Sequence, residues 1–177
     1  HTTDTNIYYL IYSCRDSKDP SNGIDYSQKL YFAEINQSLN NGEGGIVFSD
    51  SLLDDSAGLY LAPVYHEDGK SVWIAYQNYK SDTNEMRFLH FKDGNVLTIN
   101  KRIIENLNSS KINPFFSLQN QFQFNPKGNL FMLYDQNAKI AGQNFINLYY
   151  FDNNSGQLNF IRNYKSSSVF NLFNSIM

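Results

Sequence analysis

Short runs of apolar and aromatic residues recur along the chain in pairs, with polar stretches between them. The runs are rich in Tyr, Phe, Ile, Leu and Val, which favour β-strands. Corresponding positions such as Tyr12, Tyr76 and Tyr134 recur roughly 55–65 residues apart, which indicates an internal repeat. The three pairs of predicted strands are 7–13 with 29–35, 72–78 with 86–91, and 130–137 with 146–151.

Clusters of Asp, Asn, Pro and Gly lie between these apolar runs and predict tight hairpin turns. The clusters are 67–70, 92–95, 125–128 and 152–156. We expect Gly69, Gly128 and Gly156 to occupy such turns, at least two of them with positive φ. Each unit is therefore predicted to be an antiparallel meander of about four strands, the size of one propeller blade.

Helical periodicity is weak, and only 103–107 and 169–177 favour even a short helix. The pattern predicts a single all-β domain of about three antiparallel, propeller-blade-like sheets, as part of a larger β-propeller. A compact β-sandwich is the alternative. The expected units are about 7–57, 58–115 and 116–165, and 166–177 is a tail or the start of a further blade.

Composition narrows the classes of partner. The chain has 13 Tyr and 14 Phe, which suit pleated, half-buried strands. Its 14 basic residues are outnumbered by 17 acidic ones, and the basic residues are scattered, so a nucleic-acid partner is not expected. The apolar runs are far shorter than the ~20 residues of a spanning helix, so we predict no membrane span.

Four segments resemble the β-propeller (WD40-like) region of Bacteroidetes cell-surface proteins of the type IX secretion and gliding-motility kind. They occur in the expected order, although Asn41 stands where that family usually has a second glycine. The segments are 30–44 (LYFAEINQSLNNGEG), 66–74 (HEDGKSVWI), 124–130 (FNPKGNL) and 148–158 (LYYFDNNSGQL).

This resemblance implies an exported, non-catalytic module at the cell surface or outer envelope of a Gram-negative bacterium, with the periplasm as a second location. The partner it implies is a protein, a glycan, or further propeller blades of the same protein. The resemblance implies no particular ligand and no ligand-binding residues.

Residues that often bind metals occur here in turn-like surroundings. His66, Glu67 and Asp68 are adjacent, but a zinc site needs further His or Cys ligands, so a hairpin turn is the preferred interpretation. Asp152 opens a segment that begins like a calcium loop but lacks its final Glu, which again favours a turn. We therefore predict no metal, no cofactor and no catalytic residues. Trp73 and Cys14 are expected to be buried strand residues.

Several tyrosines are candidates for ligand or partner contact, because alternate residues of a strand face opposite sides and aromatic side chains often anchor binding. Packing between blades is the competing explanation. The candidates are Tyr60, Tyr65, Tyr79 and Tyr149.

The sequence thus predicts a binding or scaffold module that is not an enzyme. One alternative is a propeller-type glycoside-processing enzyme, which needs two carboxylates roughly 5–10 Å apart in a cleft. The other is a purely structural fragment of a larger propeller, which predicts large exposed apolar faces.

Overall fold

The described part of the chain is built from β-strands. The computed structural model describes residues 6–15, 28–58, 60–78, 85–104, 122–137 and 143–166. Within these ranges it has eleven strands in three antiparallel sheets and one 3-10 turn, Asn40–Gly42. The predicted all-β fold with three antiparallel sheets is therefore confirmed.

The strands of each sheet follow one another along the chain, so each sheet is a meander. The N-terminal sheet contains β1 (Ile7–Arg15), β2 (Gln28–Asn36) and β3 (Gly45–Ala57). The middle sheet contains β4 (Ala62–Tyr65), β5 (Val72–Gln77), β6 (Glu85–Lys92) and β7 (Asn95–Ile103). The C-terminal sheet contains β8 (Phe122–Phe124), β9 (Leu130–Asn137), β10 (Gln143–Asp152) and β11 (Gln157–Ser166).

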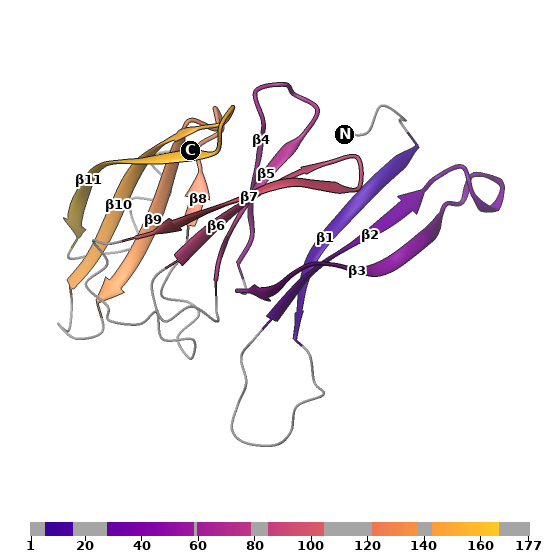
Figure 1. Cartoon of the computed structure of the whole chain (residues 1–177), viewed down its shortest axis with the longest axis horizontal. Coiled ribbons are helices and arrows are strands. Elements are labelled where there is room, and N and C mark those ends of the chain that lie inside the picture. The colour runs from indigo at the N-terminus through magenta and orange to yellow at the C-terminus, as the bar shows by residue number, and fades with distance from the viewer. Residues whose placement is uncertain are drawn as a thin grey trace, which may run out of the picture.

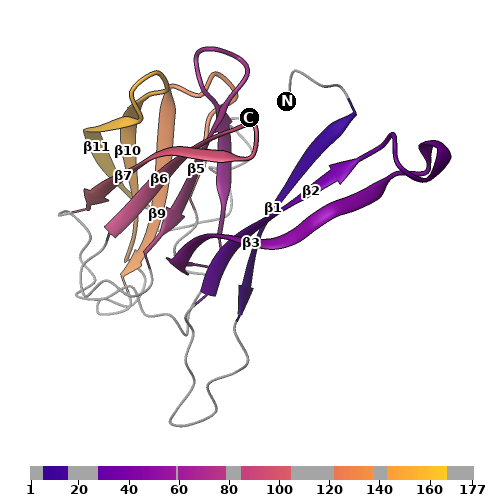
Figure 2. The same cartoon turned by 45° about the vertical axis from the view of Figure 1, so that its right-hand side comes forward.

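The three sheets lie side by side, with the middle sheet between the other two (Figures 1 and 2). Strand alternation explains this arrangement, because both faces of β5 are apolar. Ile74 and Tyr76 pack in a core with Leu30 and Phe32 of the N-terminal sheet. Trp73 and Ala75 face the other way, into a core shared with the C-terminal sheet. Burial of Trp73, which is 1% exposed, confirms the prediction for this residue.

The predicted hairpin turns are present. Gly69, Gly128 and Gly156 all lie in turns and have φ of +64°, +72° and +69°, so the prediction of positive φ is confirmed. Asp68, which precedes Gly69, accepts hydrogen bonds from the Lys70 and Ser71 amides at 2.8 and 2.9 Å. The turn chemistry that the sequence indicates is thus used locally, by side chains bonding to nearby backbone.

Some expectations differ from the structure or fall outside it. The N-terminal sheet has three described strands, whereas about four were predicted for each unit. Ile103, expected to begin a short helix, instead ends β7. The segment 169–177, predicted as a short helix or part of a further blade, lies outside the described residues. None of the helical structure in the described ranges is long and apolar enough to cross a membrane.

Candidate binding groove on the C-terminal sheet

A groove with a volume of about 940 Å³ lies against the C-terminal sheet. Its floor comes from the side chains of β9 and β10 that alternate with the buried core. Phe131 and Tyr149 face the core shared with the middle sheet, whereas the groove is lined by the partly exposed Leu148 and by Met132 and Ile146, which are 8% and 6% exposed. The floor is therefore the face of this sheet that points away from the middle sheet.

One end of the groove is built by two turns that lie at the same end of the stack (Figure 1). The β4–β5 hairpin contributes residues 63–67, and the β8–β9 turn contributes residues 125–128. The β8–β9 turn touches β4, since a Cβ on Gly128 would lie 2.6 Å from Cγ2 of Val64. Only glycine permits this approach, and it has the positive φ that the turn requires.

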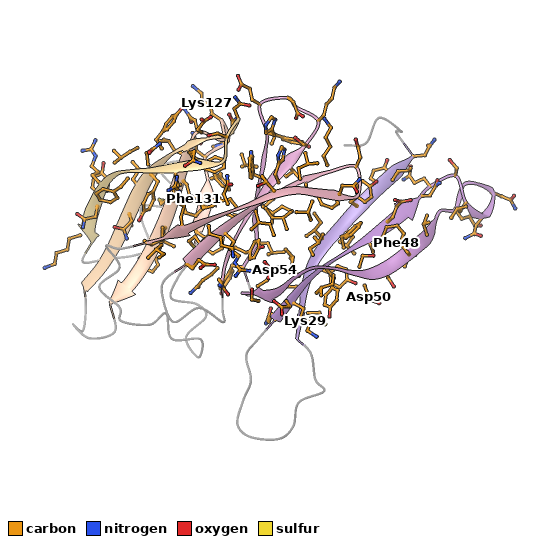
Figure 3. All side chains as sticks on the ribbon, in the orientation of Figure 1. Lys29, Phe48, Asp50, Asp54, Lys127 and Phe131 are labelled. Carbon is orange, nitrogen blue, oxygen red and sulfur yellow. The ribbon has the colours of Figure 1, made fainter. Side chains whose placement is uncertain are left out.

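The rim of the groove is polar and carries both signs of charge. Among the described residues that line it, Lys127 and Lys165 are basic and Glu67 is the one carboxylate, which leaves a net positive charge. Figure 3 shows Lys127 at the turn end of the C-terminal sheet. Tyr65 and Tyr164 are exposed aromatic residues of the same lining. The groove therefore offers an apolar floor, two exposed rings and a weakly cationic edge.

Asn125 is held rigidly at the rim. Its Oδ1 accepts hydrogen bonds from the amides of Asn129 and Leu130 at 3.0 and 2.9 Å, and its Nδ2 donates to Oδ1 of Asn129 at 2.9 Å. These bonds form within the β8–β9 turn, so they shape the groove without needing a ligand.

Beside the groove, three rings form a cluster. The His90 ring is stacked with those of Trp73 and His66, with centroid distances of 4.4 and 4.5 Å, and the Trp73 and His66 centroids lie 6.3 Å apart. Burial, followed by the nearby His66, holds the pKa of His90 below its usual value. The His66 Nδ1 accepts the Asp68 amide at 3.0 Å, and its Nε2 lies 3.0 Å from the carbonyl oxygen of Asn154. These partners assign the tautomer that carries its hydrogen on Nε2.

The polar chain from His90 does not have the order of a hydrolase triad. The hydroxyl of Ser71 lies 2.7 Å from Nε2 of His90 and donates to Oδ1 of Asp68 at 2.9 Å. The carboxylate therefore bonds to the serine, whereas in a triad it must orient the histidine. Ser71 is also only 2% exposed, which shields its hydroxyl from a substrate.

The predicted turn at Glu67–Lys70 is present, and it is linked to the neighbouring sheet. Three side chains of the middle sheet face successive carbonyl oxygens of the β10–β11 turn, an arrangement that we name the carbonyl clasp. Its contacts are His66 Nε2 to Asn154 at 3.0 Å, Trp73 Nε1 to Asn153 at 2.8 Å, and Asn100 Nδ2 to Ser155 at 2.8 Å.

In the described part of the chain, no three His, Cys, Asp or Glu side chains are grouped to hold a metal ion.

The structure separates the four tyrosines predicted to contact a partner. Tyr65 is 60% exposed and lines the groove. Tyr60 is partly buried against the core between the middle and C-terminal sheets. Tyr79 lies outside the described residues. Tyr149 is only 5% exposed, so the expectation that it is open to a partner is wrong.

Two sequence expectations fail for the same reason. Tyr149 packs against Phe131 and Phe160, with ring centroids 6.2 and 5.5 Å apart. Cys14 was expected to be buried but is exposed on β1. The period of a strand tells which residues share a face, but it does not tell which face another sheet covers.

Sequence reasoning missed Met132, Leu148 and Tyr164 as groove residues. Tyr164 faces the groove because β10 pairs with β11 across a bulge at Leu148/Tyr149, and it is paired with Ile146. One sequence feature could have pointed to these groove residues. Both faces of 130–134 are apolar, which indicates a strand that is covered on two sides.

These features define an all-β chain of three stacked antiparallel sheets with a groove on the outer face of the last one. No family model matches the chain, and no curated protein matches it. Among solved structures, it is similar to a protein from Bacteroides uniformis described as a 6-phosphogluconolactonase, with a TM-score of 0.47 and 9% sequence identity. The match covers 80% of this chain and 38% of that protein, so the chain spans well under half of its length.

Proposed function

We propose that the chain is a non-catalytic binding module that holds a segment of a protein partner in the groove on the C-terminal sheet. The observation that carries the proposal is the groove itself, with its apolar floor, exposed rings and mixed-charge rim. Grooves of this size that combine a mostly apolar lining with a few polar groups are typical ligand sites.

The floor favours a protein segment over a glycan. At the floor, the partly exposed Leu148 offers aliphatic surface beside the nearly buried Met132 and Ile146, and covering such surface is worth about 25 cal/mol per Å². A partner with apolar side chains gains this free energy, whereas sugar hydroxyls placed there would lose hydrogen bonds to water. Binding of a glycan is therefore the competing outcome of the experiment below.

The proposal that the module is non-catalytic has its own support. A glycosidase needs two carboxylates roughly 5–10 Å apart at its cleft. Glu67 is the single carboxylate among the described residues that line the groove. The Asp68–Ser71–His90 chain beside it has the wrong order for nucleophilic catalysis. By the resemblance described above, we place the module outside the cell, at the surface of a Gram-negative bacterium.

A second candidate function is a structural unit within a larger array of sheets. The outer face of the N-terminal sheet favours it, because Leu10 is 53% exposed and pairs with Ala33 of β2 on that face. Leu52 and Ile46 of β3 are 54% and 66% exposed. An apolar sheet face of this kind is suited to packing against another sheet.

The proposal is tested by selecting ligands on the purified chain from a displayed peptide library and, in parallel, from a glycan array. We expect peptides with apolar side chains to be enriched and Tyr164→Ala to weaken their binding at least tenfold. Tyr150→Ala is the matched control, since Tyr150 is 45% exposed on the same sheet but does not line the groove. Ligands that are insensitive to Tyr164→Ala, or glycans alone, would contradict the proposal.

A further inference from the structure

The middle and C-terminal sheets open with the same turn. The amide of His66 donates to the carbonyl oxygen of Ser71 at 3.0 Å, and the amide of Asn125 donates to that of Leu130, also at 3.0 Å. The third residue after each donor, Gly69 and Gly128, has positive φ. These matching hydrogen bonds give β5 and β9 the same register after the turn. Trp73, two residues after Ser71, therefore corresponds to Met132, two residues after Leu130.

The pairing register carries this correspondence across both sheets. Trp73 pairs with His90, and Met132 pairs with Leu148. Two residues further from the turn, Phe88 pairs with Asn100, and Ile146 pairs with Tyr164. The corresponding residues are His66 and Asn125, Trp73 and Met132, His90 and Leu148, and Asn100 and Tyr164.

On the middle sheet, this set of residues receives the tip of a hairpin. His66, Trp73 and Asn100 make the carbonyl clasp to the β10–β11 turn, and His90 supports the Trp73 ring. On the C-terminal sheet, all four corresponding residues line the groove. The groove therefore occupies the place that, one sheet earlier, is filled by a hairpin tip.

The same kind of contact occurs between the first two sheets. Gly94 lies in the β6–β7 turn of the middle sheet, and a Cβ there would lie 3.3 Å from the hydroxyl of Tyr9 on β1. Among the described residues, the turn that follows the third strand of one sheet thus meets an aromatic ring of the preceding sheet twice. The pattern is a property of the stack and not of one pair of sheets.

From this correspondence we infer that the groove receives the tip of a β-hairpin from a further antiparallel sheet of the same repeat. The inference rests on the proposed function, since it names the protein segment that the groove holds. Tyr164, which is 42% exposed, and Lys165 both line the groove, and their hydroxyl and ammonium groups supply donors for the carbonyl oxygens of the tip. Met132 and Leu148 replace the flat Trp73 and His90 rings, and their aliphatic chains pack under the tip.

The test uses a cyclised peptide with the sequence of this chain's own β10–β11 hairpin, residues 147–161, added to the whole chain. Binding is followed by NMR at the methyl groups of Met132, Ile146 and Leu148. We expect the hairpin to shift these methyl resonances and Tyr164→Ala to weaken its affinity at least fivefold. A linear peptide of the same composition in scrambled order is the control, and it is expected not to bind.

A second variant sharpens the test by giving the groove the residues of the middle sheet. It combines Asn125→His, Met132→Trp, Leu148→His and Tyr164→Asn. Because the peptide's tip fits that set in the middle sheet, we expect this variant, if it keeps the native strand content, to bind at least tenfold more tightly than the natural chain. Tyr164→Ala in the natural chain provides the readout if the variant fails to fold.

The outcomes separate the inference from the proposed function. Equal binding of the scrambled and cyclised peptides overturns the hairpin inference but leaves a protein-binding groove. Binding of the hairpin by the four-residue variant alone also overturns it. Methyl shifts caused by oligosaccharides and not by the hairpin overturn the inference together with the choice of a protein ligand.

Discussion

The two interfaces of the middle sheet are anchored by different chemistry. Towards the N-terminal sheet the anchor is ionic, because the buried carboxylate of Asp54 on β3 accepts from the Tyr76 hydroxyl at 2.7 Å and from Arg87 Nη1 at 2.6 Å. Arg87 also donates from Nε to Glu85 at 2.8 Å, and Ser56 bonds to both Asp54 and Arg87. Figure 3 shows Asp54 where β3 meets the middle sheet.

Towards the C-terminal sheet, the anchor is the carbonyl clasp, whose acceptors are backbone carbonyl oxygens. Its geometry depends on close approach, since a Cβ on Gly156 would lie 2.5 Å from Cη2 of Trp73. The first interface thus relies on matched charges and the second on the absence of a side chain. One kind of sheet stacking therefore tolerates two unrelated ways of fixing its polar groups, and each has its own weakness.

Loss of the guanidinium at the ionic interface is expected to have the largest effect. Arg87→Met leaves the carboxylates of Asp54 and Glu85 without their cation, and breaking a buried pair typically costs about 3–5 kcal/mol. Urea unfolding measures the change. Lys92→Gln is the control on the same strand, because the Lys92–Asp68 pair is partly exposed and is worth at most about 1 kcal/mol. Equal losses in the two variants would show that burial does not matter here.

Two glycines with nearly the same φ, +64° at Gly69 and +69° at Gly156, separate backbone strain from steric clash. Gly69→Ala meets no atom within 4 Å, so it bears only the strain of positive φ, about 1 kcal/mol. Gly156→Ala bears that strain, and its methyl group also clashes with the side chains of Trp73 and Asn100. The clash adds about 1–3 kcal/mol to the loss of stability. Thermal unfolding of both variants gives the difference. If Gly156→Ala is no less stable than Gly69→Ala, close approach does not define the second interface.

Acid is expected to weaken the two interfaces in different pH ranges, with smaller effects. The pKa of His90 is lowered mainly by burial and also by the nearby His66 and Lys92. The charge of Asp68 acts in the opposite direction but does not cancel this effect. The unfolded chain therefore takes up the proton first, and stability falls as pH drops below about 6.5.

At the ionic interface, burial alone would raise the pKa of Asp54, but hydrogen bonds from Ser56, Tyr76 and Arg87 lower it. The stability that the ionised Asp54 gives to the folded state is therefore lost only below about pH 3.8.

Urea titrations across this pH range, followed by the fluorescence of Trp73, check the expectation. His90→Gln should flatten the upper range and leave the lower one unchanged. A variant that keeps the full pH dependence of the natural chain would remove His90 as the cause.

Local chemistry explains which features the sequence predicts well. The turns at Gly69, Gly128 and Gly156 follow from Asp, Asn and Gly within a few residues, and their bonds close within the same turn. Tyr149 and Cys14 were misplaced because burial depends on which sheet covers a given face. The groove depends on strand register as well, since Tyr164 reaches it only through pairing with Ile146. Such long-range facts have no signature within one strand.

The sequential strand order has a consequence for how the chain acquires its structure. Every sheet pairs strands that are neighbours in the chain, and one isolated bridge, Ala57 to Asn78, links described backbone of the first two sheets. Contacts of short sequence separation form rapidly, so each meander can form from its own residues during synthesis. The remaining step is docking of preformed sheets, and the middle one, covered on both faces, should then exchange its amide hydrogens most slowly.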